Sequence, residues 1–204
     1  MKLDFEVTPA VLVPNPDTEV LVSRAIGWAR ERSSQLRAAD VGTGSGCIAV
    51  ALAHYLPQAR VWASDDDRAA LEVAERNVAA HGLDDRVAVV HGDLLEPLPA
   101  ELDLICANLP YLDAGQELPR EVLAQPRHAL FAEEGGAALV RRLLREAPSR
   151  LAAGGLLLLE LDPTVADLLH ADVSTYASHR WHRDLQGQVR VLEAVMPEAG
   201  HAQD

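Results

Sequence analysis

Three alternating glycines constrain the fold of this chain more than any other feature. Gly42, Gly44 and Gly46 follow a short apolar run that ends at Val41, and an apolar helical pattern begins at Ile48. A strand, a glycine turn and a helix in this order are typical of the first unit of a nucleotide-binding α/β sheet. Glycine is used there because it lets the backbone come close to a ligand. We therefore expect a site for a nucleoside-type cofactor here; the alternative is an ordinary tight turn.

An acidic residue, Asp40, lies where the predicted strand meets the glycine turn. The glycine spacing is G-x-G-x-G, whereas dinucleotide-binding turns have G-x-G-x-x-G. A carboxylate at this position would repel a pyrophosphate, but it suits a ligand with an ammonium group, such as the methionine part of S-adenosylmethionine. The residues predicted to bind the cofactor are therefore Asp40, Gly42, Thr43, Gly44 and Gly46.

Further acids follow the second and third apolar runs. Asp65 comes nineteen positions after Gly46, and in this type of unit an acid at the tip of the second strand binds ribose hydroxyls. Asp67 directly precedes an amphipathic helical pattern, so we interpret it as the helix N-cap. Asp93 follows the next apolar run, and a carboxylate at that strand end is placed to bind an adenine amino group. The alternative is a loop without such a role, since many loops contain Gly-Asp. We predict Asp65 and Asp93 as cofactor ligands.

A fourth apolar run, 102–107, leads straight into Asn108-Leu109-Pro110-Tyr111. Strands that alternate with helices form parallel sheets, and such sheets bind ligands at the carboxyl ends of their strands. A polar and an aromatic side chain on a proline-stiffened turn at that edge suit a substrate. The alternative is a structural turn in which Asn108 caps and Tyr111 packs. We predict all four residues as catalytic, with Asn108 also beside the cofactor.

The domain organisation follows from the same alternation. We expect an N-terminal extended or hairpin segment and helix over 1–35, one domain over 36–196 and a flexible tail over 197–204. The closing strands are predicted at 173–176 and 189–195. The irregular stretch 112–134 is typical of a lid or binding loop.

Composition excludes several classes of function. The net charge of -13 argues against stable, unspecific nucleic-acid binding, and we interpret Arg141, Arg142 and Arg145 as a solvated helix face. No stretch is long enough for a membrane span, the N-terminus is not a signal peptide, and no metal-ligand spacing is present. The only cysteines, Cys47 and Cys106, lie in apolar surroundings, which predicts no disulfide and a reducing, cytoplasmic compartment.

With these pieces in order, the chain resembles the HemK/PrmC family of S-adenosylmethionine-dependent protein-glutamine methyltransferases. Those enzymes methylate the glutamine amide in the Gly-Gly-Gln motif of peptide-chain release factors. The resemblance runs from about Phe5 to Val195 and rests on VTPAVLVPNPDTEVLV, DVGTGSGCIAVALA, ASDDDRAALEVAERN, NLPY, PREVLAQPRHALFAEEGG and RDLQGQVRVL. It implies an α/β, Rossmann-like class I methyltransferase with a seven-stranded, mostly parallel sheet and helices on both faces. It also implies S-adenosyl-L-methionine as cofactor and a protein substrate.

By the same resemblance, the Asn108 side-chain oxygen and the Leu109 carbonyl accept hydrogen bonds from the substrate amide, and Tyr111 packs against it. The chain departs from the family at Leu109, where the motif has proline, at Asn15, where an arginine is common, and at Gln125, where glutamate is usual. We expect no room for the family's N-terminal helical docking domain. Two alternatives stay open: an adenine methyltransferase, because NLPY is also similar to the motif of ribosomal RNA adenine dimethyltransferases, and a homologue that modifies a small molecule or nothing.

Overall fold

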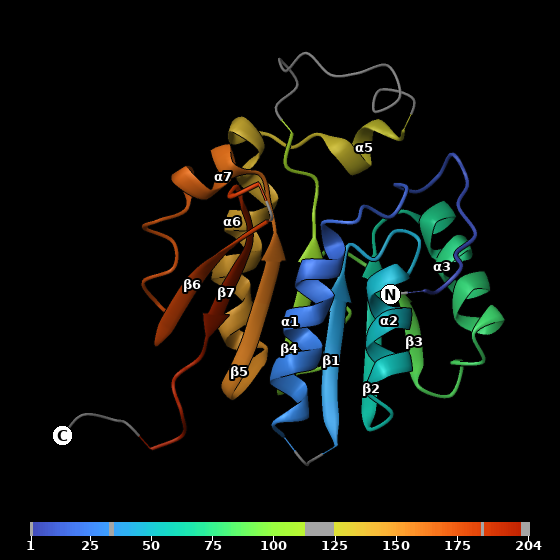
Figure 1. Ribbon diagram of the computed structural model, residues 1–204, viewed down its shortest axis with the longest axis horizontal. Coiled ribbons are helices and arrows are strands. Elements are labelled where there is room, and N and C mark those ends of the chain that lie inside the picture. The colour runs from blue at the N-terminus through green and yellow to red at the C-terminus, as the bar shows by residue number, and fades with distance from the viewer. Residues whose placement is uncertain (1, 33–34, 113–124, 185, 201–204) are drawn as a thin grey trace.

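The computed structural model describes residues 2–32, 35–112, 125–184 and 186–200. Its strands are β1 (Leu36–Val41), β2 (Ala59–Asp65), β3 (Val87–His91), β4 (Leu102–Asn108), β5 (Leu151–Glu160), β6 (Ser178–Arg183) and β7 (Val189–Val195). They form one sheet in the order β3-β2-β1-β4-β5-β7-β6 (Figure 1). The first five strands in this order pair in parallel, and β7 runs antiparallel to both β5 and β6. The predicted seven-stranded, mostly parallel sheet is confirmed.

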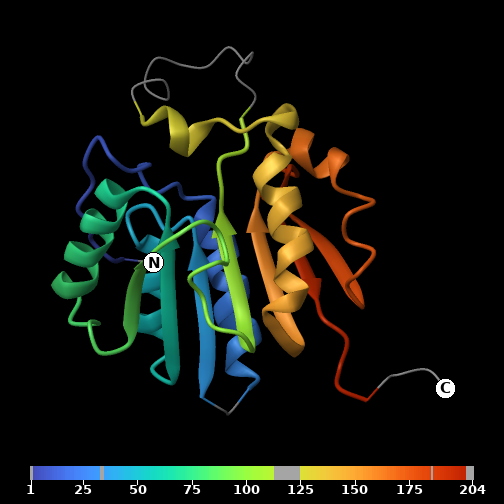
Figure 2. The same cartoon turned by 180° about the vertical axis from the view of Figure 1, so that it is seen from behind.

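Helices lie on both faces of this sheet (Figures 1 and 2). The helices are α1 (Thr18–Arg30), α2 (Cys47–Tyr55), α3 (Arg68–Ala80), α5 (Arg127–Leu130), α6 (Ala138–Glu146) and α7 (Pro163–Leu168), with short 3₁₀ turns η1 (Glu134–Gly136) and η2 (Ala147–Ser149). Helices α1 and α2 cover one face and α6 covers the other. The short α5 lies near the carboxyl edge of the sheet, within a stretch predicted to be irregular.

The core consists of two apolar layers, one on each face of the sheet. Successive residues of a strand point to opposite faces, and both faces are covered here, so β4 and β5 read as continuous apolar runs. From Leu104 onward in β4 and from Leu156 onward in β5, even-numbered apolar residues pack with α1 and α2, and odd-numbered ones pack with α6. The first layer includes Leu104, Cys106, Leu156 and Leu158, and the second includes Ile105, Ala107, Leu157 and Leu159. This alternation decides which way the last residue of each strand points.

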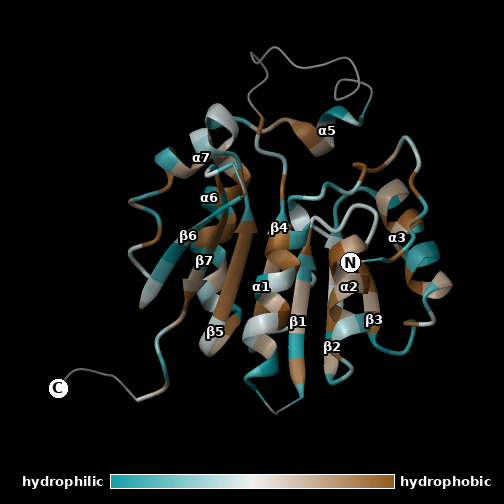
Figure 3. Cartoon of the chain, in the orientation of Figure 1, coloured by the Kyte–Doolittle hydropathy of each residue, from teal (hydrophilic) through white to brown (hydrophobic). Residues whose placement is uncertain are grey.

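The edge strand β6 differs from the prediction. We expected a closing strand at 173–176, but that stretch is a turn, and the strand lies at Ser178–Arg183. Val173 and Tyr176 are buried in the apolar layer that contains α6, and this burial explains the apolar pattern without a strand. The Tyr176 hydroxyl donates a hydrogen bond to the Leu144 carbonyl at 2.9 Å. The real strand is largely polar and exposed (Figure 3), which protects a sheet edge from pairing with other chains.

Residues 2–15 form no strand pairing, so the hairpin alternative is wrong; the segment is irregular, with one turn in which the Val11 N–H donates to the Thr8 carbonyl at 3.1 Å. The predicted lid over 112–134 and the tail over 197–204 fall partly on residues 113–124 and 201–204, which lie outside the described residues. Within the described ranges, no helix has the length and apolar character needed to cross a bilayer. No group of three or more potential metal ligands gathers among those residues either.

Candidate active site

The glycine turn is held against the end of β2. The backbone N–H groups of Gly42 and Thr43 both donate to the Ser64 carbonyl at 2.9 Å. Gly46 takes a left-handed conformation (φ 80°) as the N-cap of α2, and a Cβ atom there would lie 3.2 Å from Cα of Ala74 in α3. Gly46 therefore serves the close approach of two helices, whereas the start of the turn faces the carboxyl edge of the sheet.

Asp40 is fully buried beneath this turn. Its Oδ2 accepts hydrogen bonds from the Thr43 hydroxyl at 2.6 Å and from the Ala49 backbone N–H at 3.0 Å, so it ties the turn to α2. Its Oδ1 is buried and has no partner among the described residues. Burial raises the pKa of the Asp40 carboxyl to about 7. Its role towards an ammonium group stays a prediction.

Asp65 ends β2 beside the same turn. Its Oδ2 accepts a hydrogen bond from the Gly44 N–H at 2.8 Å, and its Oδ1 accepts one from the Asp67 N–H at 3.0 Å. Burial raises the pKa of the Asp65 carboxyl, and the two N–H groups oppose this by stabilising its charged form. Asp67 in turn accepts from the Ala69 N–H at 2.9 Å, which confirms it as the N-cap of α3.

A first cavity lies over the glycine turn, and we call it the turn cavity. The cavity lies at the carboxyl ends of β1, β2, β3 and β4, where parallel sheets bind their ligands. Among the predicted cofactor residues, its lining includes Gly42, Gly44, Asp65, Asp93 and Asn108. Asp40, Thr43 and Gly46 lie outside that lining and support the turn from below.

Asp93 carries an ion pair that the sequence did not indicate. Its Oδ2 lies 2.7 Å from Nη2 of Arg142 on α6, and Arg142 also pairs with Glu146 at 2.7 Å. Arg141 pairs with Glu134 and Asp172. These two arginines are therefore bound to carboxylates, and neither belongs to a free basic patch.

A second cavity, the acceptor cavity, adjoins the turn cavity. Both are lined by Asn108, Leu109 and Pro110, and the acceptor cavity adds Tyr111 from the same motif. Its other lining residues come from the N-terminal segment, α5 and the strand ends, and they include Leu12, Asn15, Gln125, Asp162 and Arg190. The four predicted catalytic residues thus lie at the junction of two cavities. Tyr111 is largely buried, which raises the pKa of its hydroxyl.

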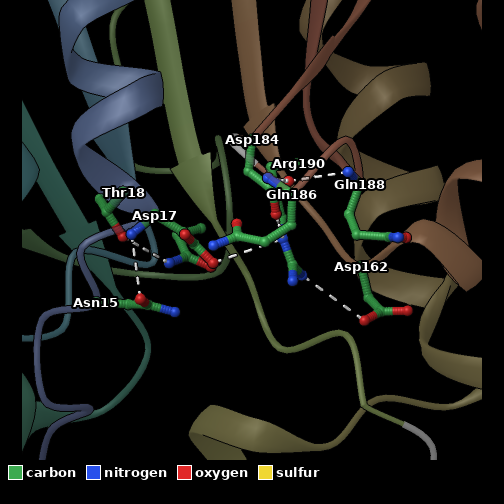
Figure 4. Close-up of polar contacts among 9 residues, drawn as sticks. Asn15, Asp17, Thr18, Asp162, Asp184, Gln186, Gln188 and Arg190 are labelled. Atoms are coloured by element: carbon green, nitrogen blue, oxygen red, sulfur yellow. Dashed lines mark hydrogen bonds and ion pairs between the residues drawn. The ribbon is translucent and has the colours of Figure 1, made fainter.

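Arg190, which lines the acceptor cavity, lies close to three carboxylates, and one of them, Asp162, also lines that cavity (Figure 4). Nε of Arg190 lies 3.0 Å from Asp184 Oδ2 and 3.5 Å from Asp17 Oδ2, and its Nη1 lies 3.9 Å from Asp162 Oδ2. Asn15 accepts a hydrogen bond from the Asp17 N–H at 3.1 Å, so the residue that replaces the family's arginine shapes the approach to α1. This cluster joins α1, β7 and the loop before α7 at the site.

Sequence reasoning missed three residues near this junction: Arg190, which lines the acceptor cavity, and Thr18 and Glu160, which lie beside Asn108 without lining either cavity. Thr18 and Glu160 are buried polar groups, and Arg190 lies in the apolar run of β7. Strand alternation carried the only signal, since Glu160 has the same parity as Leu156 and Leu158 and so points toward α1. The alternation places Glu160 beside Asn108 only when the pairing register between β4 and β5 is known.

Fold and site together define a Rossmann-like class I methyltransferase. A solved methyltransferase structure from Pyrococcus furiosus superposes with a TM-score of 0.71 at 20% identity, covering 96% of this chain and 89% of that chain. The sequence profile of the methyltransferase small domain matches residues 18–140.

Sequence relatives narrow this class. A release factor glutamine methyltransferase of Moorella thermoacetica is 43% identical over 97% of this chain and 72% of its own length. A ribosomal protein uL3 glutamine methyltransferase of Bordetella pertussis is 43% identical over 77% of this chain and 54% of its own length. The chain belongs to the family of the release factor glutamine methyltransferases, and it is a methyltransferase.

Proposed function

We propose that this protein transfers a methyl group from S-adenosylmethionine to the side-chain amide of a glutamine in a protein, of the peptide-chain release factor type. The observation that carries the proposal is the meeting of two cavities at Asn108, Leu109 and Pro110. One cavity lies over a glycine turn suited to a cofactor, and the other opens beside an amide-binding motif. The names of the sequence relatives support glutamine as the acceptor.

The residues of the turn cavity fit the proposed cofactor. A side chain on Gly44 would meet no protein atom within 4 Å, so its backbone is open to a ligand. Asp65 would bind the ribose hydroxyls and Asp93 the adenine amino group. Asp40 lies beneath the cavity lining, and its unpartnered Oδ1 would attract the ammonium end. When bound, S-adenosylmethionine supplies an electrophilic methyl group on a sulfonium.

The acceptor cavity fits a planar amide. An amide nitrogen is a weak nucleophile because its lone pair is delocalised into the carbonyl, so the protein must orient it and support its developing charge. In our proposal, Asn108 Oδ1 and the Leu109 carbonyl accept the two N–H groups. Leucine offers a carbonyl as proline does. Tyr111 packs against the plane of the amide, and the walls of the cavity exclude water.

The charge of the chain favours a protein substrate over nucleic acid. A net charge of -13 opposes the phosphate contacts that dominate nucleic-acid affinity. Arg142, which pairs with Asp93 of the turn cavity, and Arg190, which lines the acceptor cavity, are already bound to carboxylates. We further infer a cytoplasmic location, which the two free cysteines support.

The test is methyl transfer from radiolabelled S-adenosylmethionine to purified release factor, with a release factor whose Gly-Gly-Gln glutamine is changed to alanine as control. Ribosomal protein uL3 and a short RNA serve as competing acceptors. Label on the wild-type release factor alone is the expected result. Label on uL3 alone would keep glutamine chemistry and replace the partner, and label on RNA alone would overturn the proposal.

A further inference from the structure

Asn108 and Glu160 lie side by side at the ends of two neighbouring strands. They are register partners in the parallel pairing of β4 and β5. Both have the parity of the residues that pack against α1 and α2, so both point to that face. Glu160 is 1% exposed, and its Oε2 has no partner among the described residues. A buried carboxylate thus lies directly beside the residue proposed to hold the acceptor.

Thr18, at the start of α1, completes the group. Asn108 Nδ2 lies 3.4 Å from the Thr18 hydroxyl oxygen and donates to it. Both side chains also act on the Glu160 carboxyl as hydrogen-bond donors, which lowers its pKa. Thr18 is 6% exposed, so water does not compete freely for these contacts. Three elements that are far apart in sequence therefore meet around one carboxamide.

The chemistry of these partners selects one orientation of the carboxamide. Its oxygen and its amino group have nearly the same shape, so hydrogen-bond partners decide which end points where. An ionised carboxylate only accepts hydrogen bonds, and a threonine hydroxyl that donates to it has lone pairs left to accept. The amino group of Asn108 must then face Glu160 and Thr18.

We propose that Glu160 and Thr18 are positioning residues that hold the amino group of Asn108 and thereby present its Oδ1 to the acceptor N–H. This proposal rests on the proposed function and names the groups that give the acceptor cavity its preference for a hydrogen-bond donor. With the opposite orientation, Asn108 would offer its own N–H groups to the substrate nitrogen and repel it.

The orientation depends on the charge of Glu160. Thr18 and Asp17 face it from α1, Cys47 from α2, Asn108 and Tyr111 from β4 and its extension, and Arg190 from β7. Burial raises the pKa of the Glu160 carboxyl to about 7; Asp17 adds to this, and Arg190 and the two hydrogen bonds oppose it. Protonated Glu160 becomes a donor and is able to bind the Asn108 oxygen instead. The fraction of molecules in which Asn108 Oδ1 faces the acceptor is therefore expected to increase as the pH rises through the pKa of Glu160.

The first test needs no substrate. The side-chain N–H signals of Asn108 are assigned in the ¹⁵N–¹H spectrum by their loss in Asn108→Ala, and are then followed as the pH is raised. We expect both signals to shift with the ionisation of Glu160 in the wild type and to lose this response in Glu160→Gln. Signals that shift identically in both proteins, or in neither, would overturn the proposal, even if methyl transfer to glutamine were never observed.

The second test uses turnover with release factor. Glu160→Gln is expected to lower kcat by about 10- to 100-fold, with the KM for S-adenosylmethionine little changed, because the acceptor is misplaced while the cofactor residues stay intact. Thr18→Val should lower kcat in the same way, and Thr18→Ser, which keeps the hydroxyl, should restore most of it. Glu193→Gln is the matched control, since Glu193 pairs with His182 and lines neither cavity.

The pH profile separates positioning from mere stability. Wild-type kcat is expected to rise through the ionisation of Glu160, and the Glu160→Gln profile to be low and flat. A folded Glu160→Gln protein with wild-type kcat and an unchanged pH profile would overturn the proposal. An inactive wild type would instead count against the proposed function and leave the spectroscopic test to decide the positioning role.

Discussion

The side chain of Leu109 packs against the backbone of Gly42. A Cβ atom on Gly42 would lie 2.7 Å from Leu109 Cδ2, so these two residues fit together only because Gly42 has no side chain. Leu109 is 4% exposed and lines both cavities. The residue that replaces the family's first proline therefore fills the space between the glycine turn and the acceptor cavity.

Shortening this side chain should affect both stability and turnover. Leu109→Ala removes a buried side chain and is expected to lower the free energy of unfolding by about 2–5 kcal/mol. It should also lower kcat, because the gap beside Gly42 admits water and loosens the motif. Leu168→Ala is the control, since Leu168 is 47% exposed and should lose much less stability. Equal losses in urea denaturation of the two variants would show that Leu109 does not pack as described.

Loss of the Asp65 carboxylate should weaken cofactor binding. Asp65→Ala is expected to reduce the affinity for S-adenosylmethionine by about 1–3 kcal/mol, from the lost charge-assisted hydrogen bonds to ribose. The variant also releases the Gly44 N–H, which loosens the turn. Asp67→Ala removes a neighbouring acid that caps α3 and lines neither cavity, so it should lower stability and leave affinity close to wild type. Unchanged calorimetric affinity in folded Asp65→Ala would refute the ribose assignment.

The sheet could be predicted from the sequence because its central strands are buried on both faces. Apolar runs such as 102–107 and 156–159 have the length of a strand, and glycine, proline and capping residues mark their ends. The edge strand β6 was misplaced for the opposite physical reason. It is exposed and polar, so no apolar period marks it, whereas Val173 and Tyr176 are buried without being in a strand.

The candidate site could be predicted only where a residue ends a strand or follows one directly in the chain. Asp65, Asp93 and Asn108 are such residues, and the structure brings them to one cavity. The hydrogen bond between Thr18 and Asn108 and the contact between Asp17 and Arg190 join segments that are far apart in sequence. A single sequence contains no register between strands, so these contacts could not be derived from it.

The stability of the protein without cofactor should fall as the pH rises. Burial raises the pKa of Asp40 to about 7, compared with about 3.9 for an unfolded aspartate. Between these two pKa values the folded protein holds more protons than the unfolded chain. The free energy of unfolding is therefore highest below the lower pKa, and it falls as the pH rises through the upper pKa. Glu160 acts with the same sign.

Chemical denaturation between about pH 4 and pH 8 measures this effect. The slope should be at most about 1.4 kcal/mol per pH unit for each group. Asp40→Asn keeps a similar shape without a titrating carboxyl, so it should remove its part of the slope and leave that of Glu160. A free energy of unfolding that rises with pH in the wild type would contradict the buried, protonated state of both groups.

Asn108 should be essential for turnover and dispensable for cofactor affinity. Asn108→Ala removes the oxygen proposed to accept the substrate N–H, and is expected to abolish methyl transfer. The turn cavity keeps Gly42, Gly44 and Asp65, so the calorimetric affinity for S-adenosylmethionine should stay near wild type. Single-turnover rates with release factor measure the first effect. Equal rates for variant and wild type would rule out a catalytic role, whereas a large loss of cofactor affinity would make Asn108 chiefly a cofactor ligand.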